Sequence, residues 1–179
     1  DPSSAIKGLK GNDVYLLFIE SYGHTVFEKR EHLNLFTPVL RRFEHDLSAG
    51  GFAVVSNFID APSYGGTSWL AHATVVSGLH IDNQVRYQFL LTSTIRTTIE
   101  KFNIAGYRTV CVMPGTTRPW PEGAFFGYSR IYTQPAFGYR GPGFGWSAMP
   151  DQFVLDFVRR RERGTASGAS PRRGVAWPW

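Results

Sequence analysis

An unbroken apolar run near the start of the chain restricts the fold more than any other feature. Residues 14–19, VYLLFI, are followed directly by Glu20 and by a turn at Tyr22-Gly23. Such a run without polar alternation is typical of a strand buried on both faces of a parallel sheet. Because ligands of open α/β sheets bind beyond the carboxyl ends of the strands, we expect Glu20 to lie near a ligand. The alternative is a strand-end carboxylate that only faces water.

Strand-like and helix-like segments alternate along the chain. Thr37-Pro38 is typical of a helix start, and Gly106 of a helix stop. We expect strands over 14–19, 52–58 and 108–113, and helices over 37–49, 68–77, 82–103 and 151–160. This order predicts an α/β fold, with a mostly parallel sheet that carries helices on both faces.

A segment of different composition occupies residues 115–150, which are rich in glycine, proline and aromatic residues but have no periodicity. It holds too many turn residues for a long regular element. Four of its side chains are candidates to contact a polar head group or a sugar: Arg118, Trp120, Arg140 and Trp146. For each single residue we favour the alternative, a packed irregular loop that uses its aromatic side chains as a local core.

The positive charge is concentrated at the end of the chain. Residues 159–179 contain six arginines and one glutamate, which leaves 13 basic and 13 acidic side chains in residues 1–158. We therefore divide the chain into a folded part, 1–158, and a basic tail, 159–179, that we expect to be disordered. An equally good interpretation of the tail is the truncated or out-of-frame end of a longer enzyme. The neutral folded part gives no electrostatic support for nucleic-acid binding.

The lone cysteine and the lengths of the apolar runs exclude further classes. Cys111 alone cannot form an internal disulfide or a cysteine-rich zinc site, and its strand-like surroundings predict a buried apolar role. No run approaches the roughly 20 apolar residues that span a membrane, so we expect no transmembrane segment in this chain.

A glycine turn leads into a helix at residues 64–78, YGGTSWLAHATVVSG. Thr67 or Ser68 is suited to cap this helix, and Gly65 and Gly66 let the backbone approach a ligand closely. The free N–H groups of a helix start favour an anion such as phosphate or sulfate, and the same position suits a nucleophile. Taken alone, such a turn is more often simply a capped helix.

The two motifs together carry a family resemblance. FIESYG at 18–23, followed by GGTSW at 65–69, resembles the sulfatase-like branch of the alkaline-phosphatase superfamily, especially membrane-anchored lipoteichoic acid synthases, phosphoglycerol transferases and phosphoethanolamine transferases. The stretch MPGTTRPWPEGAFFGY at 113–128 is also similar to this branch. The resemblance covers most of residues 13–157. It implies an alkaline-phosphatase-like fold, of which residues 1–158 would be the N-terminal, incomplete part of a catalytic domain.

The resemblance assigns chemical roles to two residues. Glu20 matches a ligand of a divalent metal, Mn, Mg or Zn, and Thr67 matches the metal-bound nucleophile, with Ser68 as the backup. It implies a phosphoryl-group transferase or hydrolase for phosphorylated or sulfated glycan or lipid head groups, on the periplasmic or extracellular face of a membrane. We prefer phosphoryl transfer to sulfate-ester hydrolysis, because TSWLAH lacks the proline and arginine of the sulfatase motif C/S-x-P-x-R.

The chain departs from the family in one respect. The family's metal site is completed downstream by an Asp-His pair, but no histidine follows His80 and no aspartate follows Asp156. We therefore expect an incomplete metal site that does not retain its ion. The alternative function is a non-catalytic, truncated homologue that binds a glycan or a partner through residues 115–150. An incomplete sheet would also offer an open edge for self-association.

Overall fold

A computed structural model describes residues 6, 8–9, 12–19, 23–143, 145, 147–163 and 172–177 of the chain. The chain separates into two compact units. One unit combines Asp1–Phe18 with Pro62–Trp179, and the other is Ile19–Ala61. Each unit is described by itself.

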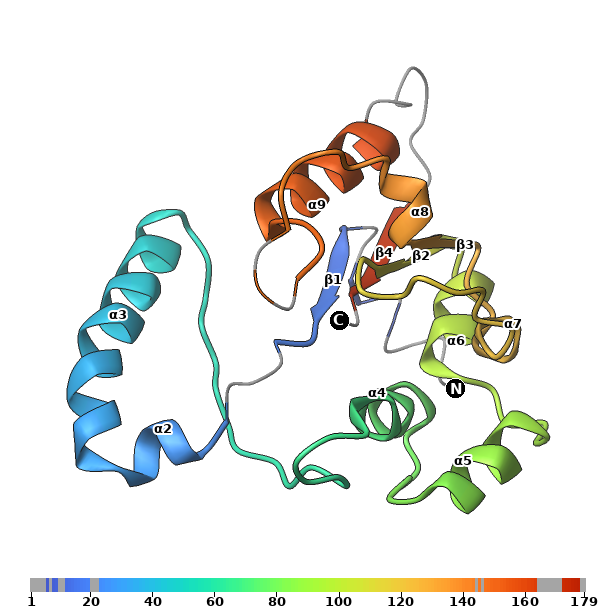
Figure 1. The fold of residues 1–179 in the computed structure, drawn as a ribbon, viewed down its shortest axis with the longest axis horizontal. Coiled ribbons are helices and arrows are strands. Elements are labelled where there is room, and N and C mark those ends of the chain that lie inside the picture. Colours follow the sequence, from blue (N-terminus) through green and yellow to red (C-terminus); the bar gives the residue numbers. More distant parts are fainter. Residues whose placement is uncertain are drawn as a thin grey trace. The chain divides into compact units, whose positions relative to one another are not determined.

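The larger unit is built on a four-stranded parallel sheet (Figure 1). Its strands are β1 (Val14–Leu17), β2 (Tyr107–Met113), β3 (Arg130–Thr133) and β4 (Arg172–Trp177), in the order β1-β4-β2-β3. Strands β1 and β2 lie where the apolar runs predict them, although β1 is shorter than expected. The prediction of a mixed helix and strand fold with a parallel sheet is therefore confirmed at this level.

Two apolar cores form in this unit. The first gathers side chains from α4 (Ser68–Ser77), α5 (Gln84–Leu91), α6 (Thr98–Ile104) and α7 (Gly123–Phe126). The second joins β2 and β3 to α8 (Gln134–Phe137) and α9 (Asp151–Val158). Figure 1 shows α8 and α9 on one side of the sheet and α4 on the other. Cys111 in β2 is fully buried, which confirms its expected role.

The prediction of a single helix over 82–103 is wrong, because two helices, α5 and α6, occupy this range. Helix α5 ends at Leu91, where the Ser93 hydroxyl donates to the Leu90 carbonyl at 2.7 Å. Helix α6 then begins behind Thr97, whose hydroxyl accepts from the Glu100 N–H at 3.2 Å. Hydroxyl side chains that bind the backbone locally favour helix ends over helix interiors, which explains the break.

The smaller unit contains α2 (Thr25–Glu28), α3 (Arg30–Ala49) and an irregular segment. The helix expected to start at Thr37 starts earlier, so Pro38 lies inside α3 and not in its first turn. The Thr37 hydroxyl donates to the Leu33 carbonyl at 2.6 Å one turn before. The strand expected over 52–58 is also wrong. These residues are exposed, Val55 to 94%, and pair with no strand in the described part of the chain.

The aromatic segment 115–150 is more regular than its composition predicts. It contains α7, β3 and α8, each four residues long, and β3 pairs in parallel with β2. Phe126 and Phe137 from this segment are buried in the two cores. The expectation of no long regular element holds, but an edge strand was missed.

The C-terminal tail also differs from the expectation of disorder. Arg159–Arg163 continue α9 as a π-helical turn, and Arg172–Trp177 form β4 between β1 and β2. Glu162 is buried and accepts from Arg108 at 3.0 Å and from the Tyr132 hydroxyl at 2.8 Å. Its partners are distant in sequence, so composition alone does not reveal this contact. Residues 164–171 and 178–179 lie outside the described residues.

Within the described residues, no helix is both long enough and apolar enough to cross a membrane.

Candidate functional site

Thr67 holds an unusual backbone conformation at the start of α4. Its φ of 53° and ψ of 37° lie in the left-handed region, and it is the only non-glycine residue with a positive φ in the described part of the chain. Gly65 and Gly66 before it also have positive φ values, of 67° and 142°. The predicted glycine turn is therefore present, and the run of positive φ values continues through Thr67.

The Thr67 hydroxyl does not cap the helix. Thr67 is the N-cap residue by position, but its Oγ1 donates to the Gly66 carbonyl at 2.7 Å and accepts no hydrogen bond from the first turn. The side chain is exposed. Ser68, the backup nucleophile, is the first residue of α4 and is half-buried. The Leu70 N–H already donates to the Thr67 carbonyl at 2.9 Å, so a ligand at Thr67 would meet only those first-turn N–H groups that lack an intrahelical acceptor.

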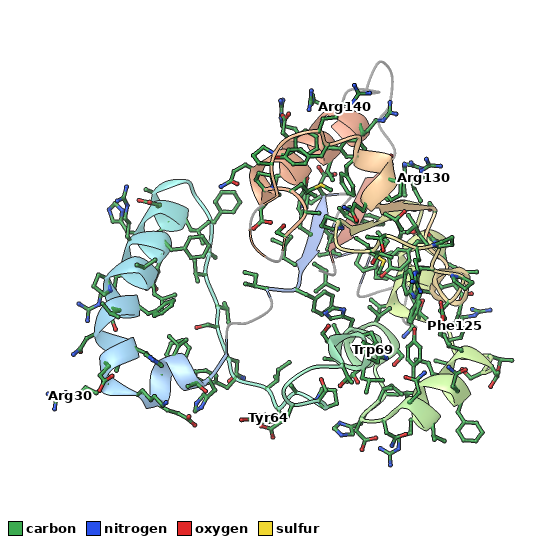
Figure 2. The ribbon with its side chains drawn as sticks, in the orientation of Figure 1. Arg30, Tyr64, Trp69, Phe125, Arg130 and Arg140 are labelled. Atoms are coloured by element: carbon green, nitrogen blue, oxygen red, sulfur yellow. The ribbon has the colours of Figure 1, made fainter. Side chains whose placement is uncertain are left out.

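The structure does not bring all the predicted site residues together. Glu20 and Trp146 lie outside the described residues. Arg118 and Arg140 are exposed, and Figure 2 shows Arg140 far from Trp69, which follows Thr67 by two residues. Trp120 is half-buried and packs against the first core, as the loop-core alternative predicted.

A pocket with mostly aromatic walls lies beside α4. Of its lining residues, only Trp120 was predicted from the sequence to contact a ligand. The space in it that a water-sized molecule can reach is small, about 60 Å³, and it opens to solvent. Phe18 and Met113 bring it to the carboxyl ends of β1 and β2, where parallel sheets bind ligands. We call it the aromatic pocket; its walls include Phe18, Trp69, His72, Tyr87, Met113 and Trp120.

The rings of the aromatic pocket contact one another across elements. The centroids of Phe18 and His72 are 4.2 Å apart, and Trp120 stacks on Phe126 at 5.5 Å. Burial raises the pKa of Tyr87, and the Glu122 carboxylate raises it further. These walls come from four separate stretches of chain. Three of the stretches carry the motifs at 18–23, 65–69 and 113–128, but only Trp120 among the lining residues was expected to contact a ligand.

The described residues do not fit the divalent metal that the resemblance implies. Among them, no three His, Cys, Asp or Glu side chains lie close enough together to hold an ion. The expected ligand Glu20 is outside them, and the Thr67 hydroxyl is directed to the Gly66 carbonyl. The metal therefore stays a prediction from the resemblance, and we assign no chemical step to it.

Comparison of the chain with family models, with curated proteins and with solved structures finds no match. The resemblance to the sulfatase-like branch thus depends on the two short motifs and on the similar stretch at 113–128.

Proposed function

We propose that this chain carries the nucleophile of a phosphoryl-group transferase or hydrolase that acts on phosphoesters of extracytoplasmic lipid or glycan head groups, with Thr67 as the nucleophile. The observation that supports this most is the left-handed backbone of Thr67. That conformation costs about 1–2 kcal/mol for any residue with a Cβ, and a glycine would avoid the cost. A threonine at this position therefore suggests that its hydroxyl group has a function that glycine could not supply.

The surroundings of Thr67 suit an anionic group. Helix α4 begins at the next residue and is ten residues long, so its N-terminal N–H groups and dipole favour phosphate. The turn of Gly65 and Gly66 gives the anion room next to the backbone. The Thr67 side chain is exposed, as attack on a substrate requires.

The proposed reaction has two balanced steps. The Thr67 oxygen attacks phosphorus and forms a threonine–phosphoryl bond, while the bond from phosphorus to the leaving alcohol breaks. The threonine proton passes to water, and the leaving oxygen takes up a proton. Water or an acceptor alcohol then attacks the same phosphorus, and the Thr67 oxygen leaves and is protonated again.

The test is covalent labelling of the full chain by an activated diester, bis(4-nitrophenyl) phosphate, with and without Mn²⁺. We expect release of 4-nitrophenolate and a mass increase on the peptide that contains Thr67. Thr67→Ala abolishes the label at this peptide, whereas Ser68→Ala, one residue along, retains it. Circular dichroism of both variants shows whether each is folded.

Labelling of Thr67→Ala equal to that of the wild type would overturn the proposal, as would a wild-type chain that is never labelled. The sulfate-ester alternative is examined with 4-nitrophenyl sulfate: faster cleavage of the sulfate than of the diester would favour it. The non-catalytic, glycan-binding alternative has less support, because Trp120 stacks on Phe126 in the core.

A further inference from the structure

We infer that a second pocket, between the sheet and helices α4 and α6, is a binding site for one unbranched alkyl chain of about eight carbon atoms. It lies beside the last turn of α4, about 12 Å along the helix axis from Thr67. The site therefore does not depend on the chemistry proposed for Thr67. We call it the alkyl pocket; its walls include Val14, Leu16, Val75, Val76, Ile99 and Phe102.

The alkyl pocket is large enough for such a chain. The space in it that a water-sized molecule can reach is about 260 Å³, and it opens to solvent. For comparison, an apolar cavity of about 150 Å³ is enough to bind benzene. Val75 on α4 lines the pocket and is 42% exposed, so the entrance lies at the surface. A chain can therefore enter while the polar end of the ligand stays in water.

The sequence of β4 explains why this part of the sheet is hollow. Strand β4 lies between β1 and β2, and its Gly174 is the register partner of both Val14 and Thr109. Two residues further along, Ala176 is the partner of Leu16. Side chains of neighbouring strands normally fill the space above a sheet, but glycine has none and alanine adds only a methyl group. The middle strand therefore leaves a gap between the side chains of β1 and β2.

The pocket extends across the strands. Val14 of β1 and Thr109 of β2 both line it, and β4 runs between these two strands. Two inter-strand spacings of about 4.8 Å give a distance of roughly 10 Å, which is the length of an extended chain of about eight carbons. A single ring would fill only part of this distance, so the shape favours a chain.

The walls are suited to an apolar ligand. None of the described lining residues is Asp, Glu, Lys, Arg or His. The Thr109 hydroxyl donates to the Asn103 side chain at 2.7 Å and accepts from the Ser129 N–H at 3.0 Å. A sugar or an ion would lose its hydration here without enough hydrogen bonds in compensation, whereas CH₂ groups gain from leaving water. The pocket therefore favours an alkyl chain over a glycan or an ionic group.

The experiment measures the binding of 1-butanol, 1-hexanol, 1-octanol and 1-decanol to the full chain by isothermal titration calorimetry. Each CH₂ group that enters the pocket should raise the affinity about three- to fourfold. We expect the rise to stop at 1-octanol, with a Kd of about 0.1 mM, because further carbons stay outside. The branched isomer 2-ethyl-1-hexanol should bind more weakly than 1-octanol, because its main chain is shorter.

A lysophospholipid with one octanoyl chain, used below its micellar concentration, tests where the chain comes from. Binding as tight as that of 1-octanol assigns the chain to a lipid with a phosphate head group. Weaker binding assigns it to a free alcohol or fatty acid.

Two variants assign the signal to the alkyl pocket. Gly174→Leu adds a side chain in the gap of β4, and Val75→Phe enlarges a wall on α4. We expect each to weaken 1-octanol binding about tenfold and to end the rise in affinity at a shorter chain. Gly115→Leu is the matched control and should bind like the wild type. Gly115 is exposed, does not line the pocket, and has no atom within 4 Å of an added Cβ.

If circular dichroism shows that Gly174→Leu does not fold, Val75→Phe decides alone. Wild-type affinity in the folded pocket variants would overturn the inference. So would an affinity that keeps rising from 1-octanol to 1-decanol, because that is the behaviour of non-specific partition. Equal binding of the branched isomer, or no binding of 1-octanol by the wild type, would also overturn it.

Discussion

The backbone of Thr67 and the hydroxyl of Thr67 make separate contributions that substitutions can distinguish. The left-handed φ of 53° penalises any side chain with a Cβ, whereas the proposed chemistry needs only the oxygen. Thr67→Gly and Thr67→Ala both remove the oxygen, but only glycine relieves the backbone.

At Thr67 we therefore expect the glycine variant to be more stable than the alanine variant by about 1 kcal/mol, measured by urea unfolding. Neither variant should be labelled by the diester. The control is Ser68, the first residue of α4, where the helical backbone reverses the order and makes alanine the better residue. Equal stability of the two Thr67 variants would contradict the left-handed conformation.

Two buried tyrosines differ in whether their hydroxyls are satisfied. The Tyr107 hydroxyl is buried without a hydrogen-bond partner among the described residues, while the Tyr132 hydroxyl donates to Glu162 at 2.8 Å. We expect Tyr107→Phe to leave stability unchanged or raise it by about 1 kcal/mol. Tyr132→Phe should lower it by about 1–3 kcal/mol, because it leaves a buried carboxylate with one donor fewer. Urea unfolding of the pair tests this, and a larger loss in Tyr107→Phe would contradict it.

At the scale of elements, the boundary between α5 and α6 depends on one threonine. Thr97 is buried; its hydroxyl accepts from the Glu100 N–H at 3.2 Å and donates to the Phe126 carbonyl at 2.9 Å. Thr97 thus caps the start of α6 and also joins it to α7 by a hydrogen bond. The same feature makes the 82–103 range two helices, although its apolar spacing resembles that of one.

We expect Thr97→Ala to lower the free energy of unfolding by about 2–3 kcal/mol, because it removes the cap and leaves a buried carbonyl without its donor. Thr98→Ala is the matched control; its half-buried side chain makes neither bond, so its loss should be below about 1 kcal/mol. Thermal unfolding followed by circular dichroism measures both. Equal losses would show that the Thr97 bonds contribute little.

At the scale of the whole molecule, the sheet has a core on each face, and β2 runs between the two cores. Val110 and Val112 belong to the second core, and Cys111 between them points the other way, as strand alternation requires. Burial raises the pKa of the Cys111 thiol from 9.0 to about 12. The pKa values of Tyr87 and Tyr132 are also raised above 10.0, first by burial.

These shifts predict a loss of stability at alkaline pH. A folded pKa above the unfolded value means that the contribution of Cys111 is complete below pH 9 and is lost as the pH rises to about 12. One thiol contributes a slope of up to about 1.4 kcal/mol per pH unit. Cys111→Ala removes this titration, so its unfolding free energy should fall less steeply over this range. Parallel wild-type and variant slopes in urea unfolding would contradict the prediction.

The sequence alone determined the elements whose signals are local. The apolar runs placed β1 and β2, and the glycine turn with its apolar helix placed α4 over the expected residues. The burial that such runs predict is present in β2, where nearly every residue is buried. The expected burial of β1 on both faces is wrong, because Tyr15 and Leu17 are about half exposed while Val14 and Leu16 face the core side. The parallel sheet followed from the order of the elements.

Only the tertiary structure decided the features that depend on distant partners. The run at 52–58 has the composition of a strand but pairs with no strand among the described residues. Residues 172–177, which we expected to belong to a disordered tail, form β4 and pair with both β1 and β2. Glu162 is buried because Arg108 and Tyr132 reach it, and the aromatic pocket exists because four separate stretches converge. A strand, a buried charge and a pocket each need partners from elsewhere in the chain, and local composition does not specify those partners.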